Sequence, residues 1–151
     1  MFRDYPAYKK TFAPDVKDSK LLSHSGDQWA PELHFGRTVG LTTVNYDAEY
    51  LIQYKRLSDS SWQIFSRSTR ISELDDKGNP LSNGASQGFL WNLNSYWLIS
   101  EKKDGLYLEC RAISLSRDIP TGLGWVVRPI ISNLPRESLK ATLEQARNAL
   151  K

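Results

Sequence analysis

The order in which periodic patterns occur along the chain constrains its fold more than any single motif. Strand-like alternation of apolar and polar residues fills the middle of the sequence, whereas helical spacing occurs only near the two ends. A run of strands flanked by helices is typical of α+β domains. With 40% apolar and 25% charged residues, the sequence predicts one globular α+β domain over residues 1–151.

Six segments in the middle of the chain alternate with the period of a strand. Their predicted bounds are 16–24, 28–36, 41–57, 61–73, 89–101 and 105–117. The links between most of them are short and polar, which predicts antiparallel hairpins and meanders. The longest break, from Asp75 to Gly88, is rich in glycine and is predicted to be a surface loop.

Helical spacing marks both ends of the chain. Aromatic residues three to four apart predict a short helix over residues 2–11, interrupted near Pro6. The stretch 121–131 is apolar, and 135–150 has the pattern of an amphipathic helix that begins at Pro135. We expect this last helix to cover the buried face of a roughly six-stranded sheet.

Alternation gives three of the predicted strands a more apolar face. These faces hold Ala48, Tyr50, Ile52 and Tyr54; Trp91, Leu93, Trp97 and Ile99; and Leu106, Leu108, Cys110 and Ala112. One side of the sheet is therefore expected to be buried, with the concave volume between it and the C-terminal helix. The segment 61–73 is ambiguous, because both of its faces carry apolar residues.

Composition excludes several classes of protein. Lys and Arg number 20 and Asp and Glu 17, for a net charge of +3, and no dense basic block predicts nucleic-acid binding. The single cysteine excludes an internal disulfide framework, and with two histidines it cannot form a structural zinc site. No apolar run approaches the ~20 residues of a membrane span, so no stable membrane insertion is expected.

Four segments of the chain resemble a known superfamily. They are GFLWNLNSYW at 88–97, GLYLECR at 105–111, ISLSRDIP at 113–120 and LPRESL at 134–139. They are similar to uncharacterised bacterial members of the START-like (SRPBCC) superfamily, which includes polyketide cyclases and lipid-transfer domains. The resemblance implies the helix-grip fold, a curved antiparallel sheet wrapped around a long C-terminal helix, with a cavity for sterols, lipids or polyketides.

The chain departs from the superfamily pattern at its start. A helix-grip domain usually begins with a strand, whereas here helical spacing begins almost at Met1. We therefore expect a single START-like domain that lacks its first strand. Either the chain is truncated, or the open sheet edge pairs with a partner or a second copy as a homodimer. The compartment is cytoplasmic by default, or extracellular if a leader is missing.

Aromatic residues make up 11% of the chain, and many lie on the predicted buried faces. Such residues line apolar ligand pockets, although each one alone can also be a core residue. If Ser66, Ser68 and Arg70 point inward, they add polar groups that orient a ligand. The predicted cavity residues are Tyr50, Ile52, Tyr54, Ser68, Arg70, Trp91, Leu93, Trp97, Leu108, Cys110, Leu139 and Leu143.

Candidates for catalysis are weak. His24 and His34 lie in adjacent predicted strands and are possible acid and base groups, but they also read as ordinary strand histidines. Cys110 lies on an apolar parity, where a thiol usually serves as a packing residue. Glu109 and Asp118 are too far apart along one extended segment to share a site.

Anion binding is weakly indicated near the start of the C-terminal region. Residues 122–124 resemble only a fragment of a phosphate loop. Arg117, Arg128 and Arg136 are candidates for an anion site, but such arginines more often pair with nearby acids. No catalytic residue, metal site or cofactor is predicted.

Three functions follow from these patterns. The favoured one is binding of a small hydrophobic or amphipathic ligand, such as a lipid, isoprenoid or polyketide-like compound. The second is a cyclase, dehydratase or hydrolase that uses the same cavity. The third is an interaction module that docks through an open sheet edge.

Overall fold

The structure is a computed structural model of the 151-residue chain. It describes the backbone of residues 1–39, 42–75, 77–81, 90–116 and 124–151, and it describes the side chains of these residues except 37–39, 42, 44 and 124–135.

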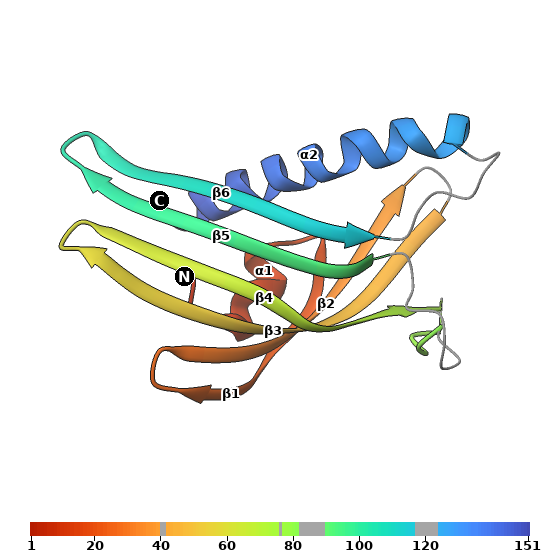
Figure 1. Ribbon diagram of the computed structural model, residues 1–151, viewed down its shortest axis with the longest axis horizontal. Helices are drawn as coiled ribbons and strands as arrows, with labels where there is room; N and C mark the ends of the chain where they lie inside the picture. Colours follow the sequence, from red (N-terminus) through yellow and green to blue (C-terminus); the bar gives the residue numbers. More distant parts are fainter. Residues whose placement is uncertain (40–41, 76, 82–89, 117–123) are drawn as a thin grey trace.

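In the part of the chain that the structure describes, six antiparallel strands form one sheet in the order in which they occur along the chain (Figure 1). They are β1 (Val16–Ser25), β2 (Gln28–Val39), β3 (Thr42–Ser58), β4 (Ser61–Leu74), β5 (Leu90–Lys102) and β6 (Gly105–Ser116). Each strand lies within a few residues of its predicted bounds. The predicted meander is confirmed, because tight turns between alternating segments place successive strands side by side.

Three helical elements occur among the described residues. They are the 3₁₀ helix η1 (Tyr5–Ala7), α1 (Tyr8–Thr11) and α2 (Gly124–Ala149). The prediction that the last helix begins at Pro135 was wrong, because α2 begins at Gly124 and Pro135 lies inside it. Proline suits a first helical position, but within a helix it removes one hydrogen bond and does not by itself end the helix.

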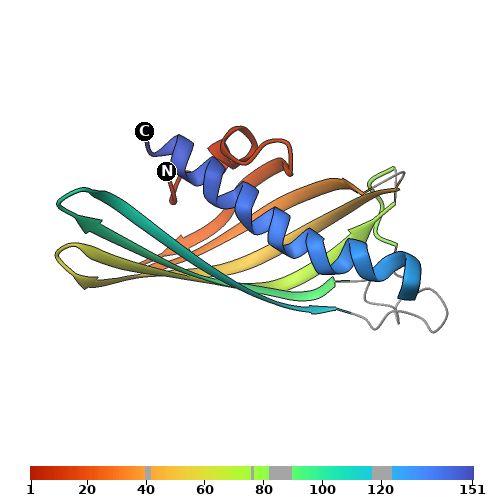
Figure 2. The same ribbon diagram turned by 90° about the horizontal axis from the view of Figure 1, so that it is seen from above.

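One face of the sheet is covered by helices and the other is open. The helix α2 crosses the sheet diagonally, and the N-terminal helices lie beside its C-terminal end (Figure 2). The Gln145 side-chain amide of α2 donates a hydrogen bond of 2.8 Å to the carbonyl oxygen of Ala13, two residues after the end of α1. We call the side that faces α2 the covered face and the other side the open face.

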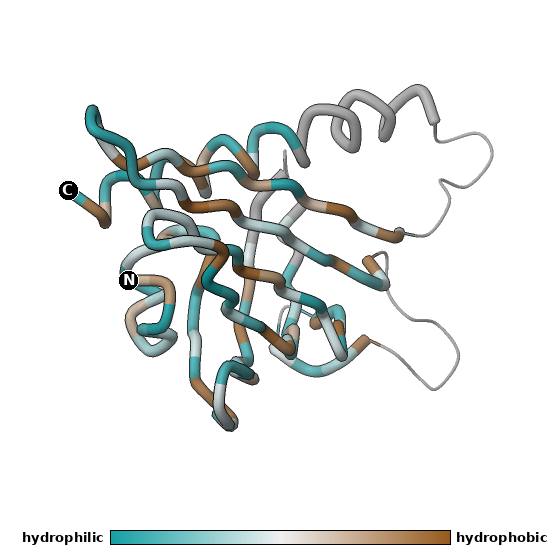
Figure 3. Tube along the Cα trace, turned by 60° about the vertical axis from the view of Figure 1, so that its left-hand side comes forward, coloured by the Kyte–Doolittle hydropathy of each residue, from teal (hydrophilic) through white to brown (hydrophobic). Residues whose placement is uncertain are grey.

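The core lies between the covered face and the helices. Its fully or almost fully buried residues are Tyr5, Phe12, Val16, Leu33, Ala48, Tyr50, Ile52, Ile64, Trp97 and Ala146. Hydropathy alternates along the strands, as Figure 3 shows, and this alternation gives the sheet one apolar face. The α+β helix-grip architecture predicted from the sequence is therefore present.

A bulge in β4 decides which of its residues are inward. Glu49 of β3 lies opposite Arg70, but the next residue, Tyr50, lies opposite Ser68, so Thr69 has no partner in the ladder. An extra residue in one strand shifts the alternation beyond it by one position. Ser66 and Ser68 therefore point to the covered face, whereas Arg70 points to the open face.

Candidate functional site

Small side chains form a row on the covered face. Across β4, β5 and β6, Ser66 lies opposite Ser95, and Ser95 lies opposite Ala112. The next row toward the hairpin turns is larger, with Ile64 opposite Trp97 and Trp97 opposite Cys110. The small residues project less far from the sheet than the large residues of the neighbouring row.

Hydroxyl groups gather at this small-residue row. We call Tyr50, Ser66, Ser68 and Ser95 the hydroxyl cluster. Tyr50 lies opposite Ser68 on the neighbouring strand, and Ser66 is two residues from Ser68 on the same face. Tyr50, Ser66 and Ser68 are buried, with exposed fractions of 6%, 9% and 6%.

The hydroxyl cluster has unused hydrogen-bonding capacity. The Leu93 backbone N–H donates a bond of 3.0 Å to Ser68 Oγ, which leaves the Ser68 hydroxyl proton free to be donated. Within the described part of the chain, the hydroxyls of Tyr50, Ser66 and Ser95 form no hydrogen bond. Burial raises the pKa of Tyr50 well above its usual value, so its phenol keeps its proton and remains a donor.

Aromatic residues close one end of the covered face. The hydroxyls of Tyr5 and Tyr54 lie 2.7 Å apart, and the Tyr54 hydroxyl also donates to the Phe2 carbonyl oxygen. Phe2 packs on Trp97 with ring centroids 5.4 Å apart. The N-terminal segment therefore fills the space beside Tyr54, and any ligand space on this face lies toward the hydroxyl cluster.

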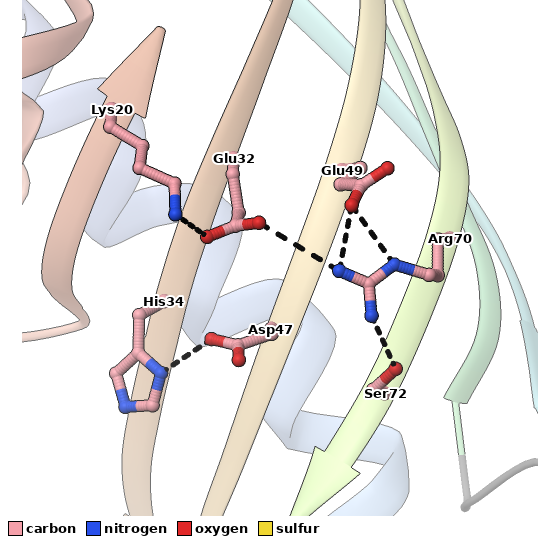
Figure 4. Close-up of polar contacts among 7 residues, drawn as sticks. All are labelled: Lys20, Glu32, His34, Asp47, Glu49, Arg70 and Ser72. Carbon is pink, nitrogen blue, oxygen red and sulfur yellow. Dashed lines mark hydrogen bonds and ion pairs between the residues drawn. The ribbon is translucent and has the colours of Figure 1, made fainter. Parts of the chain in front are cut away.

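The structure places Arg70 outside the predicted site. Its guanidinium bonds Glu49 Oε1 through Nε at 3.0 Å and Nη2 at 2.7 Å, and Ser72 Oγ through Nη1 at 3.3 Å. Glu32 links Arg70 to Lys20, at distances of 3.7 Å and 2.6 Å, so an ion-pair network crosses β1 to β4 on the open face (Figure 4). Arg70 therefore does not contribute a polar group to the covered face, because the bulge at Thr69 turns it away.

Trp91 departs from the regular pattern from which its place in the site was predicted. Its side chain is 39% exposed, and it falls at the irregular start of the β5–β6 ladder, between Leu90 and Asn92. The register shift there breaks the period-two pattern on which its assignment depended.

The remaining predicted residues lie on or near the covered face. Tyr50, Ile52, Ser68 and Trp97 are buried, and Tyr54, Leu93, Leu108, Cys110, Leu139 and Leu143 are half-buried. Leu143 of α2 packs against the core together with Leu108 and Cys110. Burial raises the pKa of the Cys110 thiol to about 12, which makes it a poor nucleophile. That these residues line a ligand cavity stays a prediction.

Sequence reasoning missed Ser95, the fourth member of the hydroxyl cluster. Its parity matches that of Trp97 and Leu93, so the alternation of β5 could have placed it on the covered face. A single serine in an apolar strand does not by itself indicate a ligand site. Its cross-strand partner Ser66 lies in the segment 61–73, whose inward face the sequence pattern does not determine.

The catalytic candidates do not come together. The imidazole of His24 stacks on Trp29 near the β1–β2 turn. His34 lies on the open face, where its Nδ1 is 2.7 Å from Asp47 Oδ1 (Figure 4). Glu109 forms an ion pair of 2.8 Å with Arg111 on the same strand.

Most of the other charged candidates lie outside the residues that the structure describes. Arg117, Asp118 and residues 122–123 lie outside the described residues, as does the side chain of Arg128, while Arg136 is exposed. In the part of the chain that is described, no group of three or more His, Cys, Asp or Glu side chains could hold a metal ion. None of the described helices combines the length and the apolar character needed to cross a bilayer.

Comparison with solved structures identifies the fold. The chain is similar to the crystal structure of the STAR-related lipid transfer protein (fragment 25–204) from Xanthomonas axonopodis, with a TM-score of 0.61 and 20% sequence identity. The match covers 97% of this chain and 75% of that one. This chain has the START-like helix-grip fold. No family model matches the sequence, and no curated protein matches it.

Proposed function

We propose that the chain binds a small hydrophobic or amphipathic molecule between the covered face of the sheet and α2. The observation that carries the proposal is the row of small residues, Ser66, Ser95 and Ala112, which crosses β4, β5 and β6 on the covered face. Small side chains on a sheet face opposite a helix favour a space that a ligand can fill. The START-like fold supports the same conclusion, since its structural relative is named as a lipid transfer protein.

Binding can be tested by filling the proposed space. We expect the apolar fluorophore 1-aminoanthracene to bind the wild-type chain saturably, and Ser95→Trp to abolish this binding. Leu98→Trp is the matched control, because Leu98 lies on the same strand but on the open face and is already exposed. Unfolding curves of both variants establish that they fold.

The outcomes distinguish a site on the covered face from nonspecific binding of the fluorophore to the protein surface. Equal loss of fluorophore binding in both variants, or equal retention in both, contradicts a site on the covered face. If Ser95→Trp does not fold, Ala112→Trp fills the same row from β6, where the side chain starts from an exposed position.

A homodimer through an open sheet edge is a second proposal, supported by the two outer strands. Two register shifts interrupt the pairing of β1 with β2, whereas the β5–β6 ladder is regular from Asn92 to Lys102. The exposed residues of β6 include Ile113 at 60% and Leu115 at 57%. Irregular edges resist pairing and regular apolar ones favour it. Sedimentation over a range of concentrations tests this, and we expect Ile113→Lys to leave only monomer.

A further inference from the structure

We infer that the ligand of the covered face is an uncharged amphiphile whose hydroxyl or carbonyl group is bound by the hydroxyl cluster. This inference rests on the proposed function and adds the chemical class of the ligand. It is carried by two independent observations, the absence of charge around the cluster and its unused hydrogen bonds.

No charge surrounds the cluster on the described part of the covered face. The inward positions within 48–54 of β3, 64–71 of β4, 93–99 of β5 and 108–114 of β6 carry only apolar, hydroxyl or thiol side chains. Two described charged residues lie just beyond these ranges. Glu73 follows Ile71 at one end, and Arg3 lies over the Tyr54 ring at the aromatic end, 4.7 Å from its centroid.

Among the described residues on the sheet side of this place, no opposite charge would compensate a charged ligand group. Transfer of an ionised carboxylate or ammonium into an apolar site is strongly unfavourable unless an opposite charge or several hydrogen bonds accompany it. The cations of the nearby sheet do not help, because Arg70 and Lys20 lie on the open face and are paired with Glu49 and Glu32. The described wall therefore disfavours fatty acids, phosphate esters and amines.

A neutral polar group, in contrast, matches the cluster. Tyr50 and Ser66 are buried residues whose hydroxyls have no hydrogen-bond partner among the described residues. Their hydroxyl oxygens are not fully enclosed, because the one described side-chain atom that is both fully buried and unpaired is Asn94 Oδ1, so a ligand group can still reach them. Ser68 already accepts from the Leu93 N–H and still has its own proton to donate. A ligand hydroxyl or carbonyl oxygen at this point accepts from these donors, and a ligand hydroxyl can also donate to Ser66 or Ser95.

A series of ligands with one chain and different head groups tests the inference. Oleyl alcohol, oleate, oleylamine and 1-octadecene are compared by displacement of 1-aminoanthracene at neutral pH. We expect oleyl alcohol to bind most tightly, and oleate and oleylamine to bind about a hundredfold more weakly. The affinity of 1-octadecene should lie between that of oleyl alcohol and those of the two charged ligands. The hydrocarbon forms no hydrogen bond with the cluster, but no charged group has to leave water when it binds.

Variants of the cluster locate the head group. Ser66→Ala and Tyr50→Phe each remove one hydroxyl and keep the packing, so each should weaken oleyl alcohol about threefold to tenfold and leave 1-octadecene unchanged. Ser100→Ala, on the same sheet but outside the cluster, is the control and should change neither affinity.

The outcomes distinguish the failure of this inference from the failure of the proposed function. If oleate or oleylamine binds as tightly as oleyl alcohol, or if the cluster variants leave oleyl alcohol unchanged, the inference is overturned while the proposed function stands. If no member of the series displaces the fluorophore and the fluorophore itself does not bind, the proposed function fails and the inference fails with it.

Discussion

Burial strongly perturbs the pKa values of several tyrosine hydroxyls. Burial is the main cause that raises the pKa values of Tyr5, Tyr8 and Tyr50 well above the usual 10.0. Tyr5 is completely buried, and its hydroxyl bonds that of Tyr54. These phenols therefore stay protonated in the folded chain at a pH where those of the unfolded chain have already ionised.

This difference predicts that the chain loses stability in alkali. Below pH 10 both states are protonated and the stability is complete, and above it the unfolded state is favoured by about 1.4 kcal/mol per pH unit for each such tyrosine. We expect the melting temperature to fall steadily between about pH 9 and about pH 11. Tyr50→Phe should make this fall shallower, and a melting temperature independent of pH over that range would contradict the assignment.

Single residues also set the limit of what the sequence predicts. Period-two alternation placed Tyr50, Ile52 and Trp97 correctly on the buried face, because burial follows parity in a regular strand. It failed at Arg70, because the register shift in β4 changes the parity there, and a register shift at the start of β5 leaves Trp91 outside the regular alternation. A bulge depends on the register between two strands, and no pattern within one strand reveals it.

At the scale of elements, the ion-pair network joins four strands on the open face. Because Arg70 is 49% exposed on its side chain, its bonds with Glu49 and Glu32 are screened by solvent. We expect Arg70→Met to lower the free energy of unfolding by no more than about 1 kcal/mol, and by less at high salt. Binding of 1-aminoanthracene should stay unchanged. A large loss of binding would show that Arg70 contributes to the ligand site.

The C-terminal end of α2 is held against the core by Ala146, which is completely buried. A carboxylate at this position would be enclosed by apolar residues without a partner. Ala146→Asp should therefore lower the free energy of unfolding by about 3 kcal/mol or more, measured by urea denaturation. Asn148→Asp, at an exposed position two residues further, is the control and should change stability little.

The extent of α2 shows a second limit of sequence reasoning. The pattern of Leu139, Leu143 and Ala146 identified its C-terminal half, since these residues recur every three to four positions. Its N-terminal half was separated from this pattern by the interpretation of Pro135 as a helix start. Helix starts are set by tertiary contacts as well as by local preference, so a proline alone did not fix the boundary.

At the scale of the whole molecule, the order of elements carried the fold prediction. Six alternating segments with short links leave few topologies, and an amphipathic C-terminal segment must cover the apolar face that they form. The ligand space was harder to predict, because it depends on which small residues meet across strands. The pairing of Ser66 with Ser95 was hidden by the ambiguous segment 61–73.

The alkylation rate of Cys110 tests the central claim most directly. Cys110 is the only cysteine, and it lies opposite Trp97 on the covered face beside the proposed site. Its raised pKa makes alkylation slow, so the reaction with iodoacetamide is followed at about pH 9. A ligand between the sheet and α2 should slow it further and saturably, with the same midpoint as displacement of 1-aminoanthracene by that ligand. An unchanged rate while oleyl alcohol is bound would show that the ligand lies elsewhere and would contradict the account.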